Sequence, residues 1–155
     1  MPILKIGDSE LAQSNTILRY IGKLTKLYPE DLLQSARVDE LLDAVEDLIL
    51  QLIPSMKEQD KNKQKEMREQ LVKEVFPKWF NFLEKRVSKF GDKNFAVGDS
   101  ITIADFKIAS FAHRMTCGAM DHVPTTVLDQ FPHLISIRDQ VLQHEKIKEW
   151  FEKNK

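Results

Sequence analysis

The sequence has a single cysteine and no long apolar run. Cys117 is the only cysteine among 155 residues, which excludes a disulfide within the chain. No apolar run is long enough to span a bilayer, and the first residues lack the apolar core of a signal peptide. We therefore expect a reducing, cytoplasmic compartment and no membrane partner. The missing signal peptide has less weight than usual, because an initial segment of the protein is expected to precede Met1.

The sequence also has little net charge of either sign. Its 23 lysines and arginines nearly balance 24 aspartates and glutamates, so the formal net charge is -1. This balance gives no electrostatic reason to expect nucleic acid as a partner. Hydrophobic residues make up 42% of the chain, which is enough for one ordinary core.

The residues that commonly hold metals or act as nucleophiles are sparse. The histidines lack the i, i+4 spacing and the carboxylate pairing of a helical zinc site, so we expect no metal. Cys117 follows a largely apolar segment, which favours an inert buried thiol over a nucleophile. The four histidines are His113, His122, His133 and His144.

The N-terminal residues predict a β-hairpin. Residues 3–6 are apolar or β-branched apart from Lys5, Gly7 and Asp8 have turn chemistry, and residues 10–12 can return as a second strand. An isolated two-stranded hairpin is only marginally stable in water. We therefore expect it to pair with strands that these 155 residues do not contain.

Helical spacing of apolar residues dominates the rest of the chain. A first helix is expected from Ser14 until Tyr28-Pro29 breaks it, and a long amphipathic helix from about Leu32 until Pro54 ends or kinks it. The apolar stripe of the long helix consists of Val38, Leu41, Leu42, Val45, Leu48, Ile49, Leu52 and Ile53.

A charged segment and a second long helical pattern follow. Residues 58–69 contain almost no apolar side chain, which predicts an exposed loop and a solvated first part of a helix. The helix should continue to Gly91, with a kink near Val75 or Phe76 because Pro77 lies inside the pattern.

Much of the segment from Thr102 to about Met120 is apolar on every side, which predicts the central helix of a bundle. Thr102 and Asp105 have the spacing of an N-terminal capping box, a structural role that outweighs a catalytic one. Two shorter helices are expected from about Leu134 and Lys146. The fold class is therefore mainly α, with a small N-terminal β-hairpin.

Five segments together resemble the cytosolic glutathione transferases, most closely the sigma, pi, mu and alpha group. They occur in the family's order and spacing, as "MPIL", "LAQSNTILRYIG", "DAVEDL", "VGDSITIADF" and "FPHL". The resemblance implies that residues 1–27 are a remnant of a thioredoxin-like glutathione-binding domain and that residues 28–155 form the all-helical C-terminal domain. It also implies glutathione as co-substrate.

The resemblance implies a set of glutathione-binding residues. The backbone of Met1, before a cis Pro2, would meet the cysteinyl part of glutathione. Gln13 and Ser14, at a helix N-terminus, would bind the γ-glutamyl carboxylate, which suits the partial positive charge there. Asp43 of the partner subunit would reach the γ-glutamyl amino group.

Each of these assignments has an ordinary structural alternative. Pro2 can be a common trans proline, because cis bonds are a minority even before proline. Ser14 can be a helix N-cap, and Asp43 can belong to a solvated helix face that also carries Asp39 and Asp47.

The sequence departs from the family at the residue that activates the thiol. Active members carry a Tyr or Ser whose hydroxyl lowers the pKa of the glutathione thiol. No residue here aligns with it, and Tyr20 and Tyr28 lie on the wrong segments. The preceding strand–helix–strand unit, of roughly 30 residues or more, would lie before Met1. We therefore expect no transferase activity from the 155 residues alone.

Three functions remain open. The first is a glutathione transferase that conjugates glutathione to small electrophiles and of which the sequence holds only a part. The second is an inactive scaffold subunit of a larger assembly. The third is a glutathione-dependent isomerase of the prostaglandin-D-synthase type. The family also implies a homodimer through the long helices that begin near Leu33 and Glu58.

Overall fold

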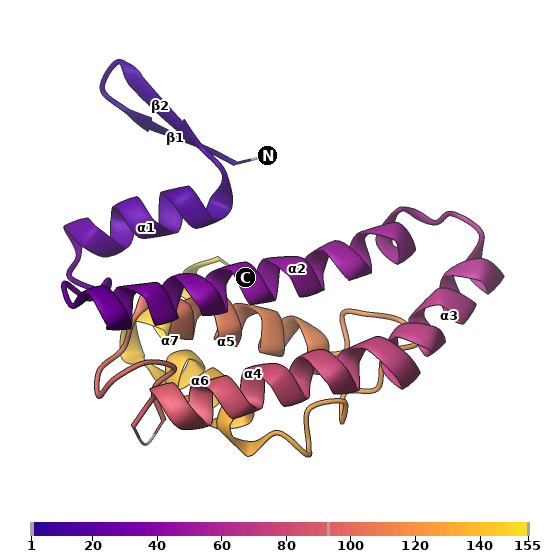
Figure 1. The fold of residues 1–155 in the computed structure, drawn as a ribbon. Helices are drawn as coiled ribbons and strands as arrows, with labels where there is room; N and C mark the ends of the chain where they lie inside the picture. Colours follow the sequence, from indigo (N-terminus) through magenta and orange to yellow (C-terminus); the bar gives the residue numbers. More distant parts are fainter. Residues whose placement is uncertain (1, 93, 155) are drawn as a thin grey trace.

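The computed structural model describes residues 2–92 and 94–154. It contains a bundle of helices, and a hairpin projects from the bundle on the first helix (Figure 1). The mainly helical fold with an N-terminal hairpin is confirmed. Among the described residues, no helix combines the length and the apolar character that crossing a bilayer requires.

The predicted hairpin consists of β1 (Ile3–Ile6) and β2 (Ser9–Ala12). The strands are antiparallel, and Ile3 lies opposite Ala12. Gly7 begins the turn with a φ of 57°, a left-handed conformation that a residue without Cβ adopts at no steric cost. In the part of the chain that the structure describes, these two strands make up the whole sheet.

Helix α1 (Ser14–Leu24) begins where the sequence predicts but ends before Tyr28-Pro29. Lys26 has a φ of 58°, and the backbone N–H of Leu27 donates to the carbonyl of Gly22 at 2.8 Å. This is the hydrogen bond of a Schellman C-cap, which terminates the helix without proline. The sequence does not reveal this C-cap, because lysine rather than glycine occupies the left-handed position.

Helix α2 (Leu32–Lys57) starts at the predicted residue, where the Asp31 carboxylate accepts a hydrogen bond from the Gln34 backbone N–H at 2.8 Å. Of the two effects expected of Pro54, an end of the helix is not observed, because α2 continues to Lys57, and a kink at Pro54 stays a prediction. Pro54 is exposed and lies in the last turn, so it removes one backbone hydrogen bond from a helix that is about to end.

The chain then forms α3 (Lys61–Gln70), a π-helical segment (Leu71–Val75) and α4 (Phe76–Phe90). The sequence predicts a kink near Val75 or Phe76, and the structure has this π-helical segment directly before Phe76. A proline ring clashes with the carbonyl four residues earlier in a regular helix, and a wider turn relieves that clash. Gly91 follows the last residue of α4, as predicted.

The charged segment after α2 is less solvated than its composition predicts. Gln64 and Arg68 are buried. The Gln64 side-chain amide donates to the carbonyls of Ser55 (3.1 Å) and Glu58 (3.2 Å), and the Arg68 guanidinium donates to the Asp121 carbonyl (2.9 Å). These long side chains donate hydrogen bonds to carbonyls at the end of α2 and in a distant loop that have no helical backbone donor.

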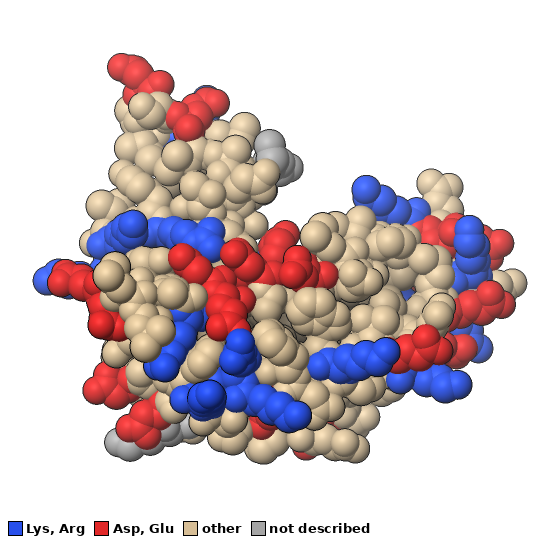
Figure 2. Space-filling view, in the orientation of Figure 1, with Lys and Arg blue, Asp and Glu red and all other residues tan. Residues whose placement is uncertain are grey.

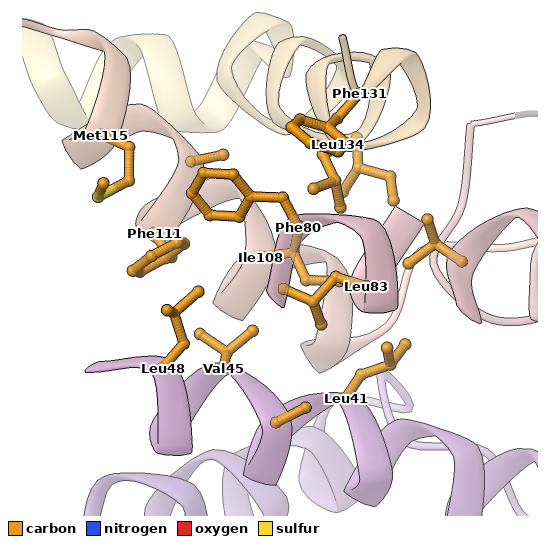
Figure 3. Close-up of a cluster of buried hydrophobic side chains, with 14 of the residues drawn as sticks. Leu41, Val45, Leu48, Phe80, Leu83, Ile108, Phe111, Met115, Phe131 and Leu134 are labelled. Carbon is orange, nitrogen blue, oxygen red and sulfur yellow. The ribbon is translucent and has the colours of Figure 1, made fainter. Parts of the chain in front are cut away.

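Helix α5 (Ile103–Thr116) occupies the centre of the bundle and ends four residues before the predicted Met120. It packs between α2 and α6 (Pro132–Gln143), and α7 (Glu145–Lys153) follows. Figure 3 shows the shared core, to which α2, α4, α5 and α6 all contribute. Its labelled residues are Leu41, Val45, Leu48, Phe80, Leu83, Ile108, Phe111, Met115, Phe131 and Leu134.

Candidate functional site

The capping box at the start of α5 is present and structural. Asp105 is only 2% exposed. Its carboxylate accepts hydrogen bonds from the backbone N–H and the hydroxyl of Thr102 (2.8 Å each) and from the backbone N–H of Ala96 (2.7 Å). Burial raises the pKa of Asp105, and these donors oppose that rise. Every polar contact points into the protein, so the pair has no access to a ligand.

An apolar groove of about 680 Å³ lies between α1, α5 and α7, with the end of α6 beside them, and we call it the α1–α5–α7 groove. Pro2 and Ser14, two of the predicted glutathione-binding residues, both line it. The other residues that line it are Ile17, Leu18, Phe106, Lys107, Ala109, Ser110, His113, Val141, Leu142, Ile147, Trp150 and Phe151. The structure thus brings the start of β1 and the start of α1 to one surface.

The backbone of Gln13 is strained. Gln13 is the N-cap residue of α1 and has a φ of 72° and a ψ of 121°, although it is not glycine. Non-glycine residues with positive φ cost free energy and gather at functional sites. Its side chain makes no capping hydrogen bond, so the N-terminal N–H groups of α1 keep their capacity to bind an anion.

Ser14 is the first residue of α1, not its N-cap, so the alternative that Ser14 caps the helix is wrong. It is half-buried and lines the groove next to the strained Gln13. Met1 lies outside the described residues, and so does the peptide bond between Met1 and Pro2. The predicted cis bond therefore stays a prediction.

Asp43 belongs to a polar network that joins α1 to α2. Its carboxylate accepts hydrogen bonds from Arg19 (3.1 Å) and from the side chain of Asn15 (3.2 Å). Arg19 also pairs with Asp39 at 2.6 Å, and the Tyr28 hydroxyl donates to Asp39 at 2.9 Å. Figure 2 shows acidic side chains gathered over the middle of α2. Asp43 thus holds α1 in place within its own chain.

Tyr28 has no opportunity to activate a thiol. Burial raises the pKa of the Tyr28 hydroxyl, and its hydrogen bond to the Asp39 carboxylate raises it further. A phenol that already donates to a carboxylate cannot donate the same proton to a thiolate. This geometry agrees with the prediction that Tyr28 does not replace the absent hydroxyl.

Asp43 also lines a second groove, between α2 and α4, which we call the α2–α4 groove. It has a volume of about 480 Å³. Trp79 and Phe82 form its apolar part, with their rings edge to face at 6.2 Å between centroids. Asp47 lies one helical turn beyond Asp43 on the same groove. Neither Trp79 nor Phe82 is among the residues singled out from the sequence, although a homodimer through the long helices that carry this groove is predicted.

Cys117 is exposed, so the prediction of a buried thiol is wrong. Helix α5 ends at Thr116, and Cys117 follows as the chain leaves the core. Among the histidines, His133 pairs with Glu84 at 2.7 Å and His113 lines the α1–α5–α7 groove. Within residues 2–92 and 94–154, no three His, Cys, Asp or Glu side chains are arranged to hold a metal ion.

Comparison with known proteins identifies relatives of the whole helical part. The model of the family "Glutathione S-transferase, C-terminal domain" matches residues 46–154. "Glutathione S-transferase P" of Pongo abelii is 38% identical over 112 residues, which are 70% of this chain and 50% of that protein. "Hematopoietic prostaglandin D synthase" of Gallus gallus is 27% identical over 154 residues, which are 99% of this chain and 72% of that protein.

The fold has close counterparts among solved structures. The prostaglandin synthase D of Nilaparvata lugens superimposes with a TM-score of 0.86 at 24% sequence identity, over 100% of this chain and 74% of that chain. This likeness shows the shared fold. The match to the glutathione S-transferase P sequence spans only half of that protein's length.

Proposed function

Because the chain belongs to the glutathione S-transferase family, we propose that it carries half of a glutathione site and conjugates glutathione to small electrophiles once the site is complete. Under this proposal, residues 1–27 belong to a thioredoxin-like glutathione-binding domain and residues 28–155 form the helical domain. The hydroxyl that activates the thiol comes from polypeptide outside these residues.

The backbone of Gln13 supports this proposal most directly. A glutamine with a φ of 72° stands immediately before α1, next to Ser14 on the groove that Pro2 also lines. The uncapped N–H groups of α1 and the Ser14 hydroxyl suit the γ-glutamyl carboxylate. Strain at this position is explained if the side chain and backbone of Gln13 are held in place for a ligand.

We propose that Asp43 contributes to the glutathione site of a second subunit. Its hydrogen bonds from Arg19 and Asn15 orient the carboxylate on the rim of the α2–α4 groove. A carboxylate there would attract the cationic amino group of glutathione. Asp47 lines the same groove and is the competing candidate for this contact.

Titration with reduced glutathione, followed by NMR or calorimetry, tests the half-site. We expect Gln13→Ala and Ser14→Ala each to weaken binding about tenfold, equivalent to one lost charge-assisted hydrogen bond. Thr16→Ala, an exposed change on the same helix, is the control and should leave affinity unchanged. Equal affinities for all three variants would overturn the assignment.

The contribution of Asp43 is tested on the same titration with Asp43→Asn and Asp47→Asn. We expect Asp43→Asn to weaken binding in the dimer, and Asp47→Asn to have little effect. The reverse result would assign the contact with the glutathione amino group to Asp47. Because Asp43 also anchors Arg19, the thermal stability of each variant must be measured beside its affinity.

A glutathione-dependent isomerase is the second candidate. The similarity to the prostaglandin D synthase of Gallus gallus extends over 99% of this chain, but some transferases match equally long parts of it, so coverage does not separate the two activities. An assay of the protein with a complete N-terminal domain decides between them. Formation of prostaglandin D supports the isomerase, and conjugation of an electrophile supports the transferase. If the protein shows neither activity, the scaffold role is favoured.

A further inference from the structure

A third concave surface lies at the corner where α1 ends and α2 begins, and we call it the α1–α2 hollow. It has a volume of about 690 Å³ and is lined by residues between Lys23 and Ser35. A volume of this size suits a small molecule. Figure 1 shows this corner at the end of α1 that is opposite the hairpin. The hollow shares no lining residue with the two grooves described above.

Two ammonium groups line the hollow. Lys23 belongs to the last turn of α1, and Lys26 follows the C-cap residue Thr25. Among the described residues, neither lysine pairs with a carboxylate. The Lys23 ammonium lies 5.4 Å from the centre of the Tyr28 ring, and the attraction between a cation and a ring face keeps it beside the hollow. Both cations are therefore available to an anion.

The strained backbone of Lys26 is a separate observation at the same place. Its φ of 58° lies in the left-handed region, where glycine has no steric penalty and a lysine has one. Glycine is also the usual residue at this position of a helix C-cap. Strained residues gather at ligand sites, where the surrounding structure holds them in spite of the strain. A use for the Lys26 ammonium explains why a lysine stands there.

The other polar groups of the hollow limit the charge of a ligand. The Tyr28 hydroxyl donates to Asp39 at 2.9 Å, and the Ser35 hydroxyl donates to the Leu32 carbonyl at 3.0 Å, so both protons are already used. Glu30 also lines the hollow, and its carboxylate would repel a second anionic group. A matching ligand therefore carries one anionic group, which lies at the lysines.

Apolar side chains adjoin the two cations. Pro29 and Leu32 line the same hollow, and Leu32 is 85% exposed. An apolar group bound there would remove this surface from water. Two ammonium groups match a phosphate monoester, which carries a charge of about −1.5 to −2 at pH 7, better than they match one carboxylate. Lysine binds phosphate as a point charge.

We infer that the α1–α2 hollow binds a small phosphate monoester with an apolar body. The phosphate lies between Lys23 and Lys26, and the apolar body covers Leu32. This site lies at the opposite end of α1 from Gln13 and Ser14, and the inference does not depend on glutathione chemistry.

Phenyl phosphate is the probe, and isothermal titration calorimetry with the 155-residue chain measures its binding. We expect saturable binding of one phenyl phosphate per chain. Inorganic phosphate lacks the apolar body and phenol lacks the charge, so each should bind more weakly than phenyl phosphate. Added salt should weaken the binding of phenyl phosphate, because it screens exposed charges.

Substitutions of Lys26 separate its side chain from its backbone. Lys26→Gly removes both the strain and the ammonium, so the chain should become more stable while its affinity for phenyl phosphate falls about fivefold, as for one exposed ion pair. Lys26→Arg keeps a cation and should keep most of the affinity. Lys73→Gln is the control, because it removes a lysine charge from an exposed residue outside the hollow and should leave the affinity unchanged.

Vesicles distinguish a free phosphate monoester from a lipid headgroup. Phosphatidic acid carries a phosphate monoester, and vesicles of phosphatidylcholine with and without phosphatidic acid are sedimented with the chain. We expect no sedimentation that depends on phosphatidic acid. Sedimentation with phosphatidic acid, without binding of phenyl phosphate, would overturn the inference and assign the two lysines to a membrane surface.

Three further results would overturn the inference. They are phenyl phosphate binding that does not saturate, inorganic phosphate binding as tight as that of phenyl phosphate, which would indicate an adventitious ion only, and equal weakening by Lys26→Gly and Lys73→Gln. A failure of the glutathione half-site is measured separately, because Gln13→Ala should change glutathione affinity and leave the affinity for phenyl phosphate unchanged.

Discussion

At the scale of single residues, two buried contacts explain why α1 and α5 sit where they do. The backbone N–H of Ile103, at the start of α5, donates to the carbonyl of Leu27 at 2.9 Å. Gly22 lies against the same residue, because a Cβ at Gly22 would be 2.7 Å from Cγ2 of Ile103 and 3.2 Å from Cβ of Tyr28. The glycine, which costs roughly 1 kcal/mol relative to alanine in a helix, is required for this close approach.

We expect Gly22→Ala to destabilise the fold, although alanine favours helix. The added methyl group overlaps Ile103, and overpacking typically costs about 1–3 kcal/mol. Urea unfolding followed by circular dichroism measures the change, with Lys23→Ala on the exposed side as control. An increase in stability would show that Ile103 moves away freely.

Asp105→Ala should lower the free energy of unfolding by about 3 kcal/mol, because the buried backbone N–H groups of Thr102 and Ala96 lose their acceptor. Asp99→Ala, an exposed change nearby, is the control. If Asp105→Ala lowers the free energy of unfolding no more than the control does, water replaces the carboxylate as the acceptor.

The pH dependence of stability reports on the same carboxylate. Burial raises the pKa of Asp105 in the folded state, so the folded protein binds this proton more tightly than the unfolded chain does. The stabilising contribution is therefore complete below the unfolded pKa of about 3.9 and is lost as pH rises through the folded pKa. The difference in the free energy of unfolding between wild type and Asp105→Ala should therefore become smaller as pH rises across this range. A difference that grows with pH would contradict this prediction.

At the scale of elements, the ends of helices were harder to predict than their apolar faces. The stripe of α2 and the apolar surroundings of α5 follow directly from residue spacing. The end of α1 depends on a left-handed lysine, and the buried face of α3 depends on carbonyls from other segments that Gln64 and Arg68 satisfy. Spacing contains no information about such partners.

Lys26→Gly should stabilise the protein by about 0.5–1 kcal/mol. Lys26 holds a φ of 58° at the end of α1, where an L side chain is strained and glycine is not. Differential scanning calorimetry should show a higher melting temperature than for wild type. Lys26→Ala is the matched control, since it removes the same side chain but keeps the strain, and a gain as large as that of glycine would exclude relief of strain as the cause.

At the scale of the whole molecule, the chain presents two different apolar surfaces. The α2–α4 groove, with Trp79 and Phe82 between acidic residues, fits the homodimer that the family resemblance implies. The α1–α5–α7 groove adjoins the hairpin and the proposed glutathione half-site. The proposed contribution of Asp43 to a partner's glutathione site would couple the association of two copies to the completion of that site.

We expect the chain to form a dimer at micromolar concentration and Phe82→Glu to shift it to monomer, because the charge enters the apolar part of the α2–α4 groove. Phe82 is 38% exposed, so the fold should survive. Light scattering gives the mass, and Leu24→Glu, an exposed change outside this groove, is the control. A monomeric wild type would contradict this arrangement.

The 155-residue chain should show no conjugation of glutathione to an electrophile by itself. The Tyr28 hydroxyl already donates to Asp39, so it is not available to a thiol. Absorbance of the conjugate measures the rate against the uncatalysed reaction. A rate above that background from the purified chain would show that a residue within it activates the thiol.

The sequence alone determined the helical class, the hairpin, the capping box and the family, because these depend on spacing and on residues that contact near neighbours. Only the tertiary structure decided that Pro2 and Ser14 share one groove while Asp43 lines another, that Gln13 is strained, that Cys117 is exposed, and that α7 leaves its aromatic residues uncovered. These properties depend on which distant elements meet, such as α1 with α5, α7 with α6, and α2 with α4.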